Sequence, residues 1–211
     1  MLLFSDPDTK PNEGFMEFRL TYEGPLYGAG NNNNRTSHKH EIRKYLHKQL
    51  KFFWDTEPRF KESGPKIITI EGEYPPRTVK ELSENFSRGN YNFVPLVTEK
   101  LLLSCHLDIL FLTNDFPGGL VKAHGDIDNK LKTLFDALRI PSECSEMQKY
   151  PTPEEDEKPF FCLLEDDRLI TSLSVEKDRL LTNFEQKEYV KALIKVTIRP
   201  YHLTMFNIHV S

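Results

Sequence analysis

The sequence predicts one mixed α/β domain of the α+β type, with helices packed on a small mixed sheet and with two insertions. Three observations lead to this class. Residues 101–113 form a long apolar run typical of a central strand, and residues 128–139 repeat apolar side chains at helical spacing. Residues 169–177 and 190–198 then alternate apolar and polar side chains, which indicates two further strands. A length of 211 residues suits one domain of generous size.

The first half of the chain is predicted to supply one strand and one long helix. Residues 1–14 are rich in Pro, Asp and Lys and are expected to be a loose lead-in to a domain at 15–200. Residues 15–23 alternate in the manner of a strand. Residues 37–53 are expected to form an amphipathic helix with a basic outer side. Its apolar stripe consists of Ile42, Tyr45, Leu46, Leu50 and Phe53.

Two stretches interrupt the regular pattern. Residues 55–95 contain scattered Pro and Gly and one short helical pattern at 79–86, so we expect an irregular insertion there. Residues 139–163 form a second insertion, a long acidic connection that begins where Pro141 ends the second helix. Residues 201–211 are expected to be a C-terminal tail. The expected order of the main elements is strand, helix, strand, helix, strand, strand.

Composition excludes several protein classes. The sequence has no run of 18 apolar residues and no signal-like start, so we expect a cytoplasmic protein without a membrane span. Three cysteines without a CxxC pair favour reduced thiols over a disulfide framework. The net charge of −4 is unevenly spread: residues 142–167 carry nine acids against two bases, and residues 35–66 carry nine bases against four acids. The basic helix is therefore a candidate for phosphate contacts, with an ordinary solvated helix face as the alternative.

Carboxylates cluster at two places that suit metal-assisted chemistry. Asp126 and Asp128 lie at the start of the second helix. At about 100° per residue, Asp128 shares a polar face with Lys132 and Asp136. Residues 165–167 are three consecutive acids just before a predicted strand. Clustered acids cost free energy unless something offsets them, and Mg²⁺ prefers carboxylate oxygens. Such an ion acidifies a bound water for attack on a phosphodiester, and a nearby lysine stabilises the developing charge.

Each of these features also has an ordinary structural explanation. Asp126 is a suitable N-cap, and Asp128 suits the first turn of a helix. Asp128 and Lys132 have the spacing of an i, i+4 ion pair. The acids at 165–167 are equally compatible with a solvated turn. A DxD pattern alone is therefore weak support for a metal site.

Other candidate sites are weaker still. His38 and His40 form an HxH pattern without a partnered Cys or Asp, so metal ligation there is disfavoured. Phe53 and Trp54 are expected in the core, with base stacking as the less favoured role. The sequence contains no Gly-rich phosphate loop and no GxSxG elbow, which argues against a P-loop NTPase and an α/β-hydrolase.

The two acidic motifs occur together with a particular spacing. Residues 126–138 have the sequence DIDNKLKTLFDAL, residues 164–170 have the sequence LEDDRLI, and Lys177 follows. This combination resembles the RusA family of Holliday junction resolvases, whose pattern is D-x-D-N-x-x-K with F-D-A-L, then D-D and a downstream Lys. The resemblance covers roughly residues 101–200 and is loose before them. It does not reach 55–95, and the family has only a short loop where this chain has its acidic insertion.

The resemblance implies a site, a cofactor and partners. The Mg²⁺ ligands would be Asp126, Asp128 and Asp167, with Asp166 as a second-tier ligand and Mn²⁺ able to substitute for Mg²⁺. Lys132 would be catalytic together with these three carboxylates. The family fold is a small α/β domain that forms a homodimer and cuts opposing strands of four-way junctions in DNA recombination and repair. The DNA contacts expected here come from the basic residues Arg35, Lys39, Arg43, Lys44, Lys48 and Lys177.

The resulting expectation is a Mg²⁺-dependent, structure-specific endonuclease that acts on branched DNA. A non-catalytic nucleic-acid or protein binding module on the same scaffold is the main alternative, with the acidic residues 142–164 as a surface for a protein partner. A metal-dependent hydrolase of another phosphate ester is a third reading of the same residues.

Overall fold

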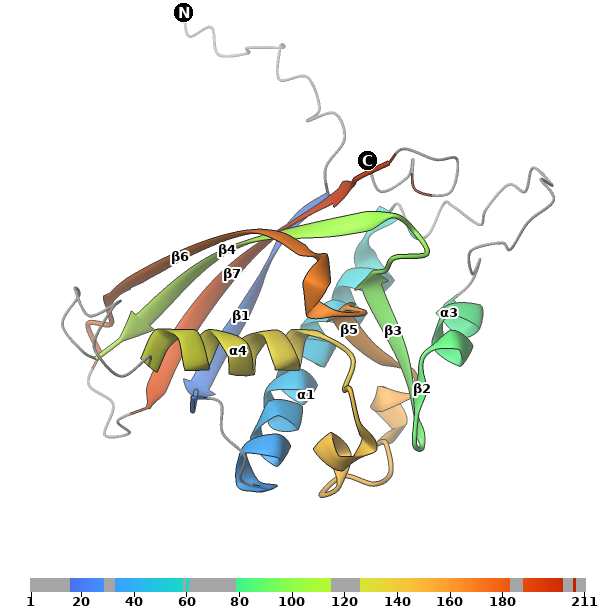
Figure 1. Ribbon diagram of the computed structural model, residues 1–211, viewed down its shortest axis with the longest axis horizontal. Coiled ribbons are helices and arrows are strands. Elements are labelled where there is room, and N and C mark those ends of the chain that lie inside the picture. Colours follow the sequence, from blue (N-terminus) through green and yellow to red (C-terminus); the bar gives the residue numbers. More distant parts are fainter. Residues whose placement is uncertain are drawn as a thin grey trace, which may run out of the picture.

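A four-stranded sheet forms the centre of the fold in the computed structural model, which describes residues 16–28, 33–58, 60, 79–114, 126–182, 188–202 and 207. Its strands lie in the order β1-β7-β4-β6 (Figure 1). They are β1 (Met16–Pro25), β4 (Leu103–Thr113), β6 (Ile170–Arg179) and β7 (Tyr189–Pro200). Strand β7 is antiparallel to both of its neighbours, whereas β4 and β6 are parallel. The sheet is therefore mixed, as the sequence predicts.

Two helices lie on the same face of this sheet (Figure 1). Helix α1 (Asn33–Thr56) follows β1, and helix α4 (Asp126–Leu138) connects β4 to β6. Parallel strands need such a crossover, because a tight turn can join only antiparallel neighbours. The main elements β1, α1, β4, α4, β6 and β7 confirm the predicted order of strands and helices. Among the described residues, no helix combines the length and the apolar character that a membrane span needs.

The two predicted insertions are more regular than expected, because each contributes to a second sheet. Its order is β2-β3-β5, with β2 (Ser87–Arg88), β3 (Tyr91–Val97) and β5 (Phe160–Leu164). Helix α3 (Val79–Asn85) precedes it and agrees with the short helix expected at 79–86. Strands β3 and β5 pair in parallel, so the insertions at 55–95 and 139–163 contact each other through this sheet. The lead-in at 1–14 and most of the tail at 201–211 lie outside the described residues.

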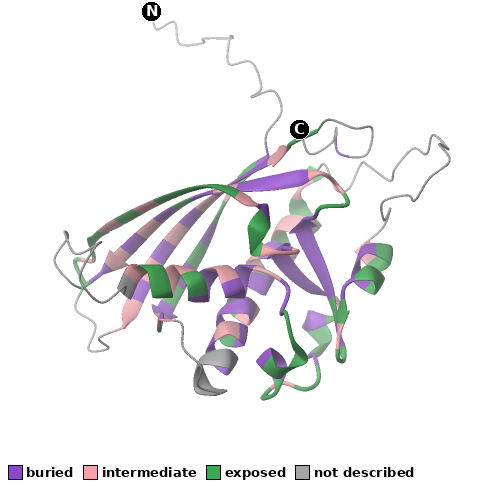
Figure 2. Cartoon of the chain, viewed as in Figure 1, coloured by how far each residue is buried: buried purple, intermediate pink, exposed green. Residues whose placement is uncertain are grey.

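The core lies between the four-stranded sheet and the helices, and extends under the second sheet (Figure 2). Alternate residues of β4 and β7 are fully buried, which explains the alternation in their sequences. Ile42, Leu46 and Leu50 of α1 are buried on its predicted apolar stripe. Tyr45 departs from that prediction, because it lies at the margin of the stripe and its side chain is 41% exposed.

A buried arginine joins three separate parts of the chain. Arg43 of α1 is only 1% exposed, and its Nη2 lies 2.9 Å from Oε2 of Glu146 in the second insertion. The same guanidinium donates to the carbonyl oxygens of Asp136 and Arg139 at the end of α4, at 2.6 and 3.0 Å. The expectation that Arg43 contacts DNA is therefore wrong for this structure, because its charge is enclosed and fully partnered.

Replacing Arg43 by Met should lower the free energy of unfolding by about 3–5 kcal/mol, since it leaves a buried carboxylate unpaired. Chemical denaturation measures this directly. The double variant Arg43→Met/Glu146→Leu should recover part of the lost free energy of unfolding, because it also removes the unpaired Glu146 carboxylate. Lys48→Met, on the exposed side of the same helix, serves as the control and should change stability by no more than about 0.5 kcal/mol. Equal effects at Arg43 and Lys48 would contradict the structural role.

Candidate functional site

The first turns of α4 carry the DxD motif. Asp128 and Lys132 are both exposed, and neither forms an ion pair with another described residue. The i, i+4 ion pair considered from the sequence is therefore not formed. Asp126 begins the helix, but its side chain lies outside the described part of the structure. Asp128 and Lys132 are thus available to a ligand on the solvent side of α4.

Contacts from two other elements hold this end of α4 in place. A Cβ atom on Gly28, in the loop after β1, would lie only 3.0 Å from Cβ of Asn129. The glycine therefore allows the loop to approach the helix closely. Lys130 Nζ also lies 2.8 Å from Oε2 of Glu188, which directly precedes β7. The turn that presents Asp128 is consequently fixed against both the β1–α1 loop and the start of β7.

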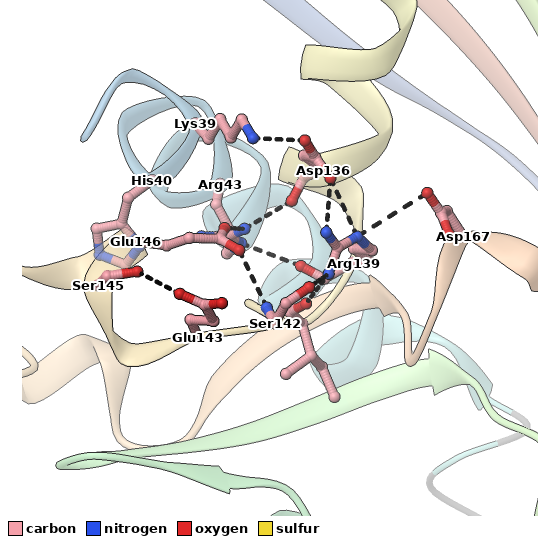
Figure 3. Close-up of polar contacts among 11 residues, drawn as sticks. Lys39, His40, Arg43, Asp136, Arg139, Ser142, Glu143, Ser145, Glu146 and Asp167 are labelled. Carbon is pink, nitrogen blue, oxygen red and sulfur yellow. Dashed lines mark hydrogen bonds and ion pairs between the residues drawn. The ribbon is translucent and has the colours of Figure 1, made fainter. Parts of the chain in front are cut away.

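The helical repeat predicts that Asp136 shares a polar face with Asp128 and Lys132. This prediction is wrong, because Asp136 is not exposed. It is buried, and its carboxylate receives Lys39 Nζ at 2.5 Å and Arg139 Nη2 at 2.6 Å (Figure 3). Burial alone would raise the pKa of Asp136, but the hydrogen bonds from Lys39 and Arg139 outweigh it and lower the pKa below its ordinary value. Asp136 is therefore an anchor between α1 and α4.

The acids at 165–167 have partners within the protein. Oε2 of Glu165 accepts a hydrogen bond from the backbone N–H of Glu99, and Oδ1 of Asp166 accepts one from the backbone N–H of Arg168, both at 3.0 Å. Asp166 thereby caps the short turn before β6. Asp167 faces Arg139, with 4.0 Å between Oδ2 and Nε (Figure 3). These donors offset the clustered charge, so the triplet does not require a cation.

The structure separates two of the predicted metal ligands. Asp167 lies beside Arg139, just past the C-terminal end of α4, whereas Asp128 lies in its first turn. A helix rises about 1.5 Å per residue, so roughly 16 Å of helix axis separates residues 128 and 139. Bonds from Mg²⁺ to oxygen are only about 2.0–2.1 Å long, so Asp128 and Asp167 of one chain cannot share an ion. Among the described residues, no group of three His, Cys, Asp or Glu side chains could hold a metal.

Three of the six bases predicted to contact DNA form ion pairs within the molecule. Lys39 binds Asp136, and Nζ of Lys44 lies 2.5 Å from Glu154 and 3.0 Å from Glu157 of the second insertion. Of the other four bases, Arg43 is buried, Lys48 is exposed without a described ion pair, Lys177 is half-buried on β6, and the side chain of Arg35 is not described. The acidic insertion thus pairs with Arg43 and Lys44 of the helix that was considered for phosphate contacts.

Three histidines of α1 belong to the interior, which sequence reasoning missed. His40 packs between Tyr150 and Phe160, and burial lowers its pKa to about 3. Nδ1 of His47 accepts the backbone N–H of Phe161 at 2.8 Å, and His38 is also buried. The aromatic pair at the end of α1 is likewise structural: Phe53 stacks on Phe18 at 4.1 Å, and Trp54 on Phe60 at 4.2 Å.

Asp136→Asn should destabilise the protein at neutral pH by about 1–3 kcal/mol, through weaker hydrogen bonds from Lys39 and Arg139. The folded-state pKa of Asp136 lies below its ordinary value of 3.8, so its stabilising charge is present above that pH and is lost as the pH falls through the folded pKa. The stability difference from the parent protein should therefore shrink below pH 3.8. Denaturation at several pH values measures it, with Asp55→Asn as an exposed control. A difference that persists unchanged in acid would refute the ionic role.

Comparison with known proteins does not identify the site. No protein-family model, no curated protein and no solved structure matches the chain. The likeness of residues 126–138 and 164–170 to the RusA motifs accordingly stays a prediction based on those residues.

Proposed function

We propose that the chain is a Mg²⁺-dependent endonuclease that hydrolyses phosphodiester bonds in branched DNA, with a RusA-like site at the start of α4. The observation that carries the proposal is the exposed pair Asp128 and Lys132. Both lack an ion pair with described residues, whereas Lys130 and Asp136 on the same helix, and Arg139 just after it, are all paired. The Asp128 carboxylate could hold a metal ion and the Lys132 ammonium group could contact a phosphate, so the pair suits a phosphate-containing substrate.

The donor set at this turn fits Mg²⁺. This ion is usually held by one or two carboxylates together with substrate phosphates, and it keeps several waters. Asp126 and Asp128 would supply the carboxylates. When bound, Mg²⁺ provides an acidified water and neutralises charge on the phosphate. Lys132, one turn after Asp128, would stabilise the negative charge that develops on the phosphodiester oxygens or protonate the leaving oxygen.

A second copy of the chain could supply its own Asp167 to this site. Among the described strands, β6 pairs only with β4, so no described strand lies along its other edge. Leu173 of β6 is aligned with the buried Leu107 of β4, yet Leu173 is 43% exposed. Antiparallel pairing of β6 with its copy, about a two-fold axis, would set the two α4 helices antiparallel. The partner subunit's Asp167 would then lie toward the end of α4 that carries Asp128.

The opposite edge of the sheet is not equally available. The side-chain amide of Gln49 accepts the backbone N–H of Thr21 at 2.9 Å and donates to its carbonyl oxygen at 2.7 Å. These bonds occupy the backbone groups of Thr21, so an added strand on β1 could not pair at that residue without displacing Gln49. We therefore place the dimer contact at β6 in this proposal.

Metal binding is the first test. Titration calorimetry with Mn²⁺ should give a binding signal that Asp128→Asn removes, and the same substitution should abolish Mg²⁺-dependent cleavage of four-way and other branched DNA. Asp55→Asn, an exposed carboxylate on α1, should leave both unchanged. A folded protein that neither binds Mn²⁺ nor cuts branched DNA would contradict the proposal. Cleavage of other phosphate esters in preference to DNA would favour the broader hydrolase reading.

Mixing two inactive variants tests whether the site is shared between subunits. Asp128→Asn and Asp167→Asn should each be inactive alone. After the two are unfolded together and refolded, half of the dimers are mixed, and each mixed dimer contains one intact shared site. Activity and Mn²⁺ sites should thus recover to about a quarter of the parent level, from the statistics of a two-fold dimer. Sites built within single chains would give no recovery, since neither chain carries both residues.

A non-catalytic binding module on this scaffold is the second candidate. The separation of Asp128 from Asp167 and the pairing of Lys39 and Lys44 with acids favour it over a nuclease that acts as a single chain. DNA binding without Mn²⁺ binding, unaffected by Asp128→Asn, would support this candidate.

A further inference from the structure

A hollow of about 570 Å³ lies between α1 and β1. It is lined by Thr21, Glu41, Lys44, Tyr45, Lys48 and Gln49. At about 100° per residue, Tyr45 lies roughly 200° around the helix from Arg43, whose guanidinium contacts the end of α4. The hollow is therefore on the side of α1 that faces away from α4. It contains none of the carboxylates assigned to the proposed nuclease site.

Tyr45 presents an aromatic ring to this hollow. Its ring meets that of Tyr22 edge to face, with 5.4 Å between centroids and 82° between planes. This contact holds the ring from one side, while the side chain remains 41% exposed. Tyr45 belongs to the predicted apolar stripe of α1, yet it stays exposed at the margin of that stripe. A ring that is held in position but left open is suited to stacking with a flat ligand.

Charged groups surround the ring. Lys48 is exposed and forms no ion pair with a described residue. Glu41 accepts a hydrogen bond from Tyr150 Oη at 3.1 Å, and its side chain is half exposed. Lys44 lies over the Tyr150 ring but is held by Glu154 and Glu157. The hollow therefore offers one available cation and one carboxylate acceptor rather than a run of positive charge.

We infer that this hollow binds a single unpaired nucleotide of a DNA strand. Tyr45 would stack on the base, Lys48 would contact the adjoining phosphate, and the Glu41 carboxylate would accept from an exocyclic amino group of the base. The limited positive charge disfavours the backbone of a duplex, which carries many phosphates. The inference deepens the proposed nuclease function and rests on it, because branched DNA exposes unpaired nucleotides near the branch.

The test compares a short single-stranded oligodeoxynucleotide with its duplex by fluorescence anisotropy, without divalent cations so that no cleavage occurs. Tyr45→Leu should weaken single-strand binding between about five- and a hundredfold, the range for one lost base–aromatic stack. It should leave duplex binding unchanged. Lys48→Gln should lower the salt dependence of single-strand binding by about 0.7 in slope, as expected for one phosphate contact. Tyr27→Leu is the matched control, because Tyr27 is 42% exposed and lies outside the hollow.

Undiminished single-strand binding by Tyr45→Leu, or an equal loss in Tyr27→Leu, would overturn the inference. Its failure is distinguishable from that of the proposed function. Mn²⁺ binding and cleavage that depend on Asp128, together with an unaffected Tyr45→Leu, would reject the nucleotide site alone. Tyr45-dependent binding in a protein without metal binding or cleavage would reject the nuclease and retain the nucleotide site.

Discussion

The ion pair between Arg43 and Glu146 is the contact on which the arrangement of the helices depends. Removing two charges from water is costly, and the cost is offset only when geometry and hydrogen bonding are good. Here the guanidinium meets one carboxylate and two carbonyl oxygens, all from segments distant in sequence. The carbonyl oxygens belong to the end of α4, where a helix leaves such groups without partners. Arg43 therefore supplies partners for the carbonyl oxygens at the end of α4. The same side chain also joins α1 to the second insertion through Glu146.

Charge in this chain is organised mainly for internal contacts. Arg43 and Lys44 of α1 form ion pairs with Glu146, Glu154 and Glu157, so part of the basic charge of α1 and part of the acidic charge of residues 142–157 offset each other. Burial alone would lower the pKa of Lys44, but the carboxylates of Glu154 and Glu157 raise it above its ordinary value. A basic helix in a sequence thus indicates a surface for a polyanion only when no acidic segment of the same chain covers it. Asp128, Lys132 and Lys48 are exposed and have no described ion pair, so they are candidates for contacts with a ligand.

Local repeats predicted most of the central fold. Strand β4 and helix α4 have long, regular patterns that depend little on their surroundings, and both were placed within a few residues. Strand β5 was missed because a five-residue apolar run inside an acidic connection fits several structures. The burial of Arg43 could not be predicted, since it depends on a carboxylate 103 residues away. The resemblance to the RusA motifs assigned Asp128 and Asp167 to one ion, but their separation depends on the length and direction of α4.

The side chain of Gln49 has a consequence for assembly. A sheet with two open edges can add copies of itself without limit and form fibres. In this sheet the amide of Gln49 occupies the backbone of Thr21 on β1, while β6 has no described partner on its outer side. In the proposed pairing through β6, the two β1 edges would form the ends of the dimer, and Gln49 covers the backbone of Thr21 there. The Gln49 amide would in this way disfavour the growth of such a pair into a polymer.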